Sequence, residues 1–277
     1  MKHLFFTEWK RRFFSFLLLG ELILLFVWNC LRIIFTDYGF DVDSVYFLYQ
    51  NIPFISILIT FHILLSMRCE VDNKTILNKL YLGYSKPLIL FIEIWISMIE
   101  STVLVAFDNI LILTLCRYRH YNLSNLTITF LNFIVCVFIV YTISVLITVL
   151  ACTISSQLIA FTIIIAGTAL LLHFGNDTTH TMIQPVKTDA FFSDGQMHPN
   201  PLYVTGTKRI LYQIHLTLSP YAQAYYADFF QAELSDIPEV SLIPSLLPFH
   251  IDFLIVDILE IIVVTIIGVK YFSRKDF

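Results

Sequence analysis

Six apolar runs, each long enough to cross a lipid bilayer, constrain the fold of this sequence more than any other feature. A helix needs about 20 apolar residues to span the hydrocarbon core, and the runs lie near residues 14–36, 47–67, 87–115, 127–151, 157–174 and 249–272. A polar patch, Cys152–Ser156, separates the fourth run from the fifth. Only 14% of the residues are charged, against about 25% in soluble domains. We therefore predict an all-α polytopic membrane protein with six transmembrane helices.

The basic residues predict the orientation of these helices. Six spans place both termini on the same side, and cytoplasmic loops carry an excess of Lys and Arg. With both termini inside, the cytoplasmic side holds 11 of the 17 basic residues: Lys2, Lys10, Arg11, Arg12, Arg68, Lys74, Lys79, Lys86, Lys270, Arg274 and Lys275. Arg117 and Arg119 are local exceptions. The pattern predicts a multi-pass protein with both termini in the cytoplasm.

Three regions follow from this topology. Residues 1–174 hold five spans, preceded by a basic helix that we expect to lie along the inner membrane surface; no small-residue cleavage site follows it, which makes a removable signal peptide unexpected. Residues 175–248 form an extracellular, partly helical segment, and residues 249–277 hold the sixth span and a cytoplasmic tail.

The extracellular segment contains a predicted aromatic helix. Ser219 and Pro220 form a helix-start signal, and the residues up to about Leu234 carry one aromatic face: Tyr221, Tyr225, Tyr226, Phe229 and Phe230. Such a face suits the outer membrane interface, but it equally suits a small packed cap above the bilayer. Both interpretations stay open on the sequence alone.

A polar stretch, Arg68–Lys86, lies between the second and third spans and predicts a short cytoplasmic helix over Asp72–Leu82. Asp72 is a plausible N-cap and Gly83 a plausible left-handed C-terminal residue. An apolar face consists of Ile76, Leu77 and Leu80, flanked by Glu70, Lys74 and Lys79. This helix can dock a protein partner or rest on anionic headgroups.

The third span carries a row of polar residues: Glu93, Ser97, Glu100, Ser101 and Asp108. At 100° per residue they fall within a sector of about 100°. Because charge inside a membrane is unfavourable, this face must line a cavity, an interface or another helix. One interpretation is a proton or cation relay. The simpler one leaves Glu100 alone at depth, paired with a group on another helix.

Several classes of function find no support in the sequence. It contains no zinc-protease HExxH, no GxSxG and no phosphate-binding GxxxxGK[ST] motif. Its five cysteines lie in or beside apolar runs without a metal-binding spacing, and a net charge of −4 gives no reason to expect nucleic acid. We predict no catalytic residue, no metal site and no cofactor on this chain.

The order of these parts resembles the permease subunits of type-2 ABC exporters, over nearly the whole chain. The likeness consists of the basic first helix (residues 8–11), the loop helix with its flanks (70–86), the polar turn at 155–157, the external helix start at 219–220 and the tail YFSRKDF at 271–277. The external segment is longer than in compact members of that family.

The resemblance implies a bacterial plasma-membrane exporter. Two permease chains, here expected as a homodimer, would pair in the lipid, and a separate ABC ATPase subunit would bind ATP and Mg²⁺. The helix at 72–82 would dock into that ATPase through Ile76, Leu77 and Leu80, with Lys74 and Lys79 at the rim. The expected cargo is amphipathic or hydrophobic, such as a peptide. Alternatives are a non-transporting sensor or immunity protein that binds a peptide externally, and an ion-coupled secondary transporter.

Overall fold

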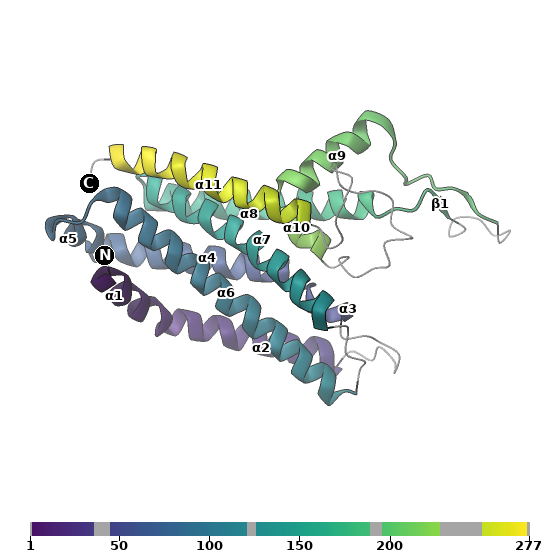
Figure 1. The fold of residues 1–277 in the computed structure, drawn as a ribbon, viewed down its shortest axis with the longest axis horizontal. Coiled ribbons are helices and arrows are strands. Elements are labelled where there is room, and N and C mark those ends of the chain that lie inside the picture. The colour runs from purple at the N-terminus through teal and green to yellow at the C-terminus, as the bar shows by residue number, and fades with distance from the viewer. Residues whose placement is uncertain (1, 36–44, 121–125, 189–195, 228–250, 276–277) are drawn as a thin grey trace.

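The molecule is a bundle of long helices lying side by side (Figure 1). The computed structural model describes residues 2–35, 45–120, 126–188, 196–227 and 251–275. The long helices are α2 (Phe16–Phe35), α4 (Ile52–Asp72), α6 (Lys86–Tyr118), α7 (Leu126–Thr153), α8 (Gln157–Met182) and α11 (Ile251–Arg274). Five of them, all except α11, are long and apolar enough to cross a membrane. This supports the predicted all-α polytopic class.

The break between the fourth and fifth predicted spans is present. Helix α7 ends at Thr153, α8 begins at Gln157, and the Ser156 hydroxyl accepts a hydrogen bond from the Ile159 amide. A hydroxyl at this position satisfies one of the amides that a helix start leaves free. Helix α8 then continues to Met182, eight residues past the predicted end of that span at residue 174.

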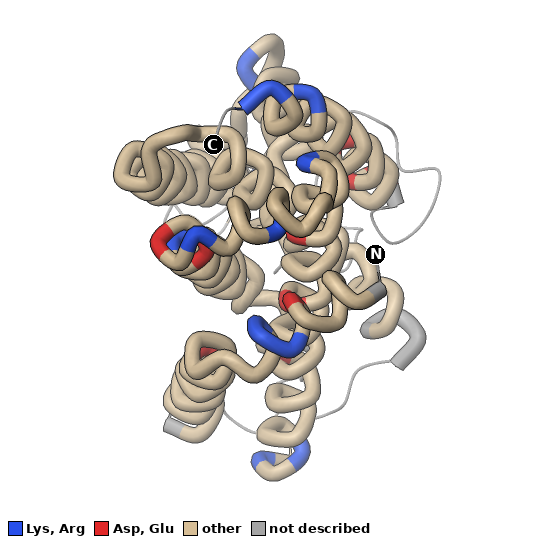
Figure 2. The backbone as a smooth tube through the Cα atoms, turned by 90° about the vertical axis from the view of Figure 1, so that its left-hand side faces the viewer, with Lys and Arg blue, Asp and Glu red and all other residues tan. Residues whose placement is uncertain are grey.

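Both termini and the short helix α5 (Thr75–Tyr81) lie at one end of the bundle, called here the α5 end (Figure 1). The amphipathic helix α1 (Lys2–Phe13) also lies there, and its last turn carries Lys10, Arg11 and Arg12. Figure 2 looks onto this end and shows basic and acidic positions on several of its segments. The α5 end is thus the charged end predicted to face the cytoplasm.

The opposite end carries α3 (Val45–Leu48), α9 (Gly206–Leu218), α10 (Pro220–Tyr226) and two short strands. The strands, β1 (Lys187–Thr188) and β2 (His198–Pro199), pair antiparallel with Lys187 opposite Pro199. They are a small departure from the all-α prediction. Helix α10 starts at the predicted Ser219–Pro220 signal and packs against α8, α7 and α4.

Gly175 permits the close contact between α8 and α10. A Cβ atom at this position would lie 2.8 Å from the Tyr221 carbonyl oxygen and 2.9 Å from the Ala222 Cα. Only hydrogen fits such a gap, and small residues allow helix backbones to approach closely in membrane proteins. The position of α10 therefore depends on this glycine.

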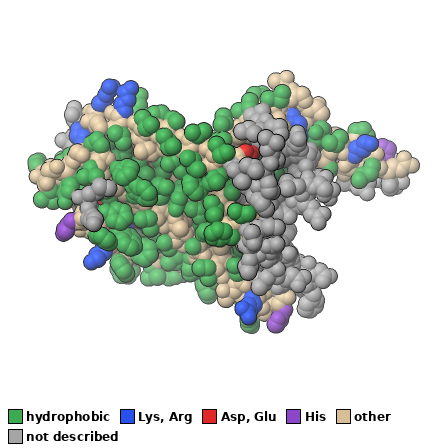
Figure 3. Space-filling view, in the orientation of Figure 1, with side chains coloured by type: hydrophobic (Ala, Val, Ile, Leu, Met, Phe, Trp, Pro, Cys, Tyr) green, Lys and Arg blue, Asp and Glu red, His purple; other side chains and the backbone are tan. Residues whose placement is uncertain are grey.

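The apolar core lies between the helices, and a broad apolar belt covers the visible face of the bundle between basic groups near its two ends (Figure 3). Helix α7 is the most enclosed of the candidate spans, packed against α11, α6 and α4, whereas α2 and α8 leave most of their surface open. Exposed Leu, Ile and Phe side chains on α2 are what a lipid-facing helix requires.

Candidate functional site: a buried ion-pair cluster beneath α5

The polar face of α6 is buried, but its members separate into different surroundings. Ser97 and Ser101 donate hydrogen bonds to carbonyl groups of their own helix. Glu93 and Glu100 enter an ion-pair cluster at the α5 end, and Asp108 belongs to a second polar group nearer the opposite end. The structure therefore brings Glu93 and Glu100 together and leaves Asp108 apart.

Lys79 of α5 lies at the centre of the cluster. Its ammonium nitrogen is 2.8 Å from Glu93, 2.9 Å from Glu70 and 3.1 Å from Glu8, and the residue is only 3% exposed. These carboxylates belong to α6, α4 and α1. Burial by itself would lower the pKa of Lys79, but attraction to Glu93, Glu70 and Glu8 outweighs it and raises the pKa above its usual value. One charged side chain thus joins α5 to three other helices.

Arg11 and Arg12 supply the remaining fixed positive charges. Arg12 is 2% exposed, forms an ion pair with Glu93, and has guanidinium nitrogens 3.5 Å from Glu100 and 3.6 Å from Glu70. Arg11 pairs with Glu70 and with Glu8. The prediction that α1 rests on the membrane surface is therefore incomplete, because its basic end enters the bundle.

His62 extends the cluster deeper along α4. Its Nδ1 lies 2.9 Å from Glu21 of α2, and its Nε2 lies 3.2 Å from Glu100 of α6. A carboxylate can only accept hydrogen bonds, and a neutral imidazole donates only one. A hydrogen bond from His62 to each carboxylate would therefore require a protonated His62; with a neutral imidazole, either Glu21 or Glu100 must carry a proton.

The cluster contains more acidic than basic groups. It holds five carboxyl groups and three permanently charged cations, and His62 is its ninth, titratable member. The members, all buried except Arg11, which is partly exposed, are Glu8, Arg11, Arg12, Glu21, His62, Glu70, Lys79, Glu93 and Glu100.

Three of these carboxylates lie as close together as metal ligands do. Oxygen atoms of Glu8, Glu70 and Glu93 lie within 4.8 Å of one another. However, the Lys79 ammonium is within 3.1 Å of each of them. A lysine belonging to the chain itself is thus placed where a bound cation would otherwise lie.

Asp108 is held by amides instead of by ions. Its Oδ1 accepts hydrogen bonds from Asn29 Nδ2 at 2.7 Å and Asn51 Nδ2 at 2.8 Å. Asn51 in turn accepts from Arg32 and from the indole of Trp28. The Asp108 group joins α2, α4 and α6, with Asn51 just before α4.

The apolar face of α5 turns toward the bundle, which corrects the predicted docking face. Ile76 is buried and Leu80 packs against the core, while Leu77 is partly buried. The expected rim position of Lys79 is also wrong, because its side chain is buried. Lys74 is exposed, as a rim residue would be.

The boundaries of α5 also differ from the prediction. Asp72 does not cap this helix: it ends α4, and the chain turns at Lys74, whose φ is 55°. Gly83 has the predicted left-handed conformation, with φ of 85°. The outward surface here includes Tyr81, the last residue of α5, which is 85% exposed, and Leu82 just after it, which is 76% exposed.

The aromatic helix is part of the packed core where the structure describes it. Tyr221 and Tyr226 are each 2% exposed, and Tyr225 is partly buried against the same core. This supports the packed cap over the membrane-interface alternative. Phe229 and Phe230 lie outside the described residues.

Sequence reasoning missed the roles of Glu8, Arg12 and Lys79. A signal was present, because buried carboxylates at Glu93 and Glu100 required cationic partners and the spans themselves held few basic residues. Many basic residues lay instead in the two predicted helices outside the spans, near residues 2–12 and 72–82. Which of these turned inward depends on the packing of α1 and α5 and could not be read from spacing.

Comparisons with protein-family models, with curated proteins and with solved structures find no match to this chain. The fold, its apolar belt and its five candidate spans define a multi-pass helical membrane protein.

Proposed function

We propose that this protein is the permease subunit of an ATP-driven ABC exporter. In this proposal α11 is the sixth span, both termini and α5 face the cytoplasm of a bacterial cell, and a second copy of the chain and a separate ATPase complete the transporter. The observation that carries the proposal is Lys79: it fixes a short helix at the membrane edge to α1, α4 and α6 at once.

Such an arrangement suits the transmission of force. A helix attached only by a flexible loop moves alone when a partner pushes it, whereas α5 is joined to its neighbours by buried charge-assisted bonds, which are strong and directional. A displacement of α5 would therefore move α4 and α6 together with it. Separating the charges would instead leave uncompensated buried carboxylates, which is highly unfavourable.

The surroundings of α5 also offer a place for a partner. A cleft of about 240 Å³ lies between this helix and the α7–α8 turn; its walls include Lys74 and Leu77 on one side and Ser155, Gln157 and Lys275 on the other. Tyr81 at the end of α5 and Leu82 just after it are exposed. Exposed aromatic and aliphatic groups with a basic rim are typical of a protein interface.

The proposed cargo, amphipathic or hydrophobic, finds support at the opposite end. A mainly apolar groove of about 570 Å³ lies between α7, α8 and α11 under the α9–α10 junction, with Glu260 and His215 among its lining residues. Clefts of this size hold small organic ligands or side chains of a peptide. The ion-coupled alternative is less favoured, because Glu93 and Glu100 are each committed to a fixed cation.

The experiment is purification of the protein from its native membrane, with a search for a bound ATP-hydrolysing subunit. We expect one to be retained and to be lost when Tyr81 and Leu82 are both changed to Ala. Tyr271→Ala is the matched control, since Tyr271 is also exposed (63%) but lies on α11. Absence of an ATPase from the unmodified protein, together with full export activity, would contradict the proposal.

A further inference from the structure

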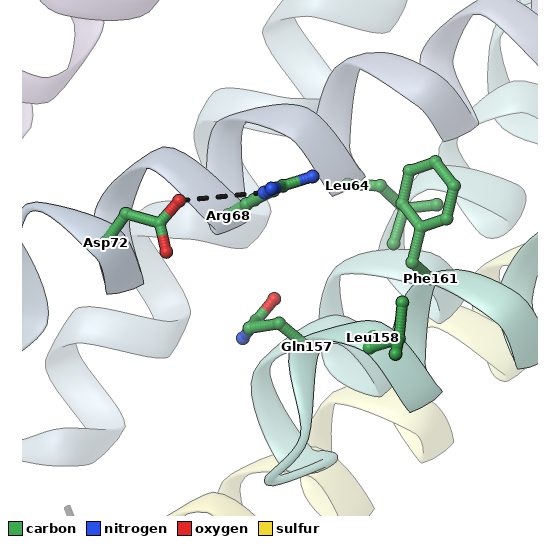
Figure 4. Close-up of a pocket in the computed structure, with 6 residues that line it drawn as sticks. All are labelled: Leu64, Arg68, Asp72, Gln157, Leu158 and Phe161. Atoms are coloured by element: carbon green, nitrogen blue, oxygen red, sulfur yellow. Dashed lines mark ion pairs between the residues drawn. The ribbon is translucent and has the colours of Figure 1, made fainter.

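A groove of about 360 Å³ opens between the end of α4 and the start of α8 (Figure 4). Its lining residues are Leu64, Arg68, Asp72, Gln157, Leu158 and Phe161. Figure 4 shows them divided along the groove: Asp72, Arg68 and Gln157 lie toward one end, and the three apolar side chains toward the other. The groove is therefore amphipathic along its own length.

The position of this division matches the edge of a membrane. Helix α4 has 21 residues, which at 1.5 Å per residue reach about 30 Å, the thickness of the hydrocarbon core. Asp72 is the last residue of this helix, Arg68 lies about one turn before it, and Leu64 lies about two turns before it. The polar end of the groove thus stands at headgroup depth on the α5 side, and the apolar end at the depth of acyl chains.

The charges in the groove balance each other. Arg68 and Asp72 are each 66% exposed, and their closest nitrogen–oxygen distance is 3.6 Å. A pair this long and this exposed contributes little to stability, so both groups remain able to bind a ligand. A ligand that complements both carries a phosphate for the guanidinium and an ammonium for the carboxylate.

The start of α8 adds a second feature that favours a phosphate. Gln157 is the first residue of this helix, and the Ser156 hydroxyl accepts from the Ile159 amide while the Ser156 carbonyl accepts from the Ala160 amide. The other amides of a first turn point outward with the positive end of the helix dipole. On the apolar side, Leu158 is 77% exposed and Phe161 is partly buried, which leaves a wall for a hydrocarbon chain.

We propose that this groove binds one phospholipid with a zwitterionic, amine-bearing headgroup, phosphatidylethanolamine, from the leaflet on the α5 side. The phosphate contacts Arg68 and the first turn of α8, the ammonium contacts Asp72, and an acyl chain lies along Leu64, Leu158 and Phe161. An anionic lipid without the amine leaves Asp72 unpaired beside a negative headgroup. Phosphatidylcholine has no N–H group to donate to that carboxylate.

The test uses the full-length protein, stripped of lipid in detergent and titrated separately with phosphatidylethanolamine, phosphatidylglycerol and phosphatidylcholine. Native mass spectrometry counts bound lipid, and thermal unfolding measures its effect. We expect one retained phosphatidylethanolamine and a Tm that rises with the logarithm of its concentration. The other two lipids should bind about tenfold more weakly, the factor expected from one lost charged hydrogen bond.

Two variants separate this site from general lipid contact. Asp72→Asn should abolish the preference for phosphatidylethanolamine, whereas Arg68→Ala, which removes the contact to the phosphate that all three lipids share, should weaken the binding of each lipid about tenfold. Both variants should fold, because these side chains are exposed. Arg274→Ala, an exposed arginine at the end of α11, should leave the preference unchanged. Equal or tighter binding of phosphatidylglycerol, absence of any retained lipid, an unchanged preference in Asp72→Asn, or undiminished lipid binding in Arg68→Ala would overturn the proposal.

Discussion

At the scale of single residues, Lys79 has the greatest influence on the α5 end. Removing its charge leaves Glu8, Glu70 and Glu93 close together without their shared partner. Breaking a buried ion pair in this way costs about 3–5 kcal/mol. We expect Lys79→Met to lower the Tm clearly in thermal unfolding of the detergent-solubilised protein.

The matched control for this change is Lys74→Met, on the exposed turn before the same helix. A surface substitution of this kind changes stability by about 0.5 kcal/mol or less. Adding Glu93→Gln to Lys79→Met should recover part of the lost stability, since it removes one of the repelling charges. Equal unfolding temperatures for Lys79→Met and Lys74→Met would argue against the cluster.

Glu100 leads to a second prediction at this scale. Its carboxylate lies between Arg12 and His62, so Glu100→Gln removes one negative charge and leaves Arg12 paired with Glu93 and Glu70. We expect a loss of about 1–3 kcal/mol, the usual result when a charged partner is removed from a buried hydrogen bond. Thermal unfolding measures it, with Glu260→Gln, a partly exposed carboxylate on α11, as the comparison. Equal loss in both variants would show that the position of Glu100 has no special role.

At the scale of helices, Gly175 controls how α10 joins the bundle. Gly175→Ala forces a methyl group against the Tyr221 carbonyl and the Ala222 backbone, neither of which can move as a flexible side chain can. Overpacking of this kind typically destabilises by about 1–3 kcal/mol. We expect a lower Tm and faster proteolysis near α10.

Gly167→Ala provides the control on the same helix. A Cβ atom there meets nothing within 4 Å, and Ala is favoured over Gly in a helix interior by up to about 1 kcal/mol. This variant should be as stable as the parent protein or more so. If both substitutions behaved alike, the close packing of α8 and α10 would be refuted.

Much at this scale could be predicted from the sequence, because apolar run length and helix-start residues are local signals. Five of the predicted spans, the break before Gln157, the start of α10 at Pro220 and the turn at Gly83 all followed from such signals. The orientation of α5 did not. Ile76 and Leu80 formed a clear apolar face, but the sequence does not show which surface such a face packs against. Whether it meets the bundle or a partner depends on contacts between distant helices.

The same reason explains the ion-pair cluster. The row on α6 showed that Glu93 and Glu100 must face inward, since charge is unfavourable in lipid. Its partners come from residues 12 and 79, which are separated from Glu93 by 81 and 14 positions. Positive residues beside a membrane span usually indicate which side of the membrane a loop faces. Arg12 and Lys79 were therefore assigned to the cytoplasmic surface, and their role inside the bundle was not predicted.

At the scale of the whole molecule, we predict that the α5 end faces the cell interior. Cys69 is exposed near the α5 end, and Met197 is 66% exposed near β2 at the other end. In a Cys69→Ser background, Met197→Cys should react with a membrane-impermeant thiol reagent in intact cells. In the parent protein Cys69 should react only after permeabilisation, and labelling of Cys69 in intact cells would reverse the proposed orientation.

The central claim, that an ATPase acts on this chain through α5, is tested most directly by photo-crosslinking from the outward surface of that helix. A photoreactive residue replaces Tyr81 in one variant and Tyr118 in another, the latter being 73% exposed at the far end of α6. In native membranes we predict a crosslink from position 81 to a nucleotide-binding protein, and none from position 118. Correctly inserted protein that gives no nucleotide-binding product from position 81 would contradict the account.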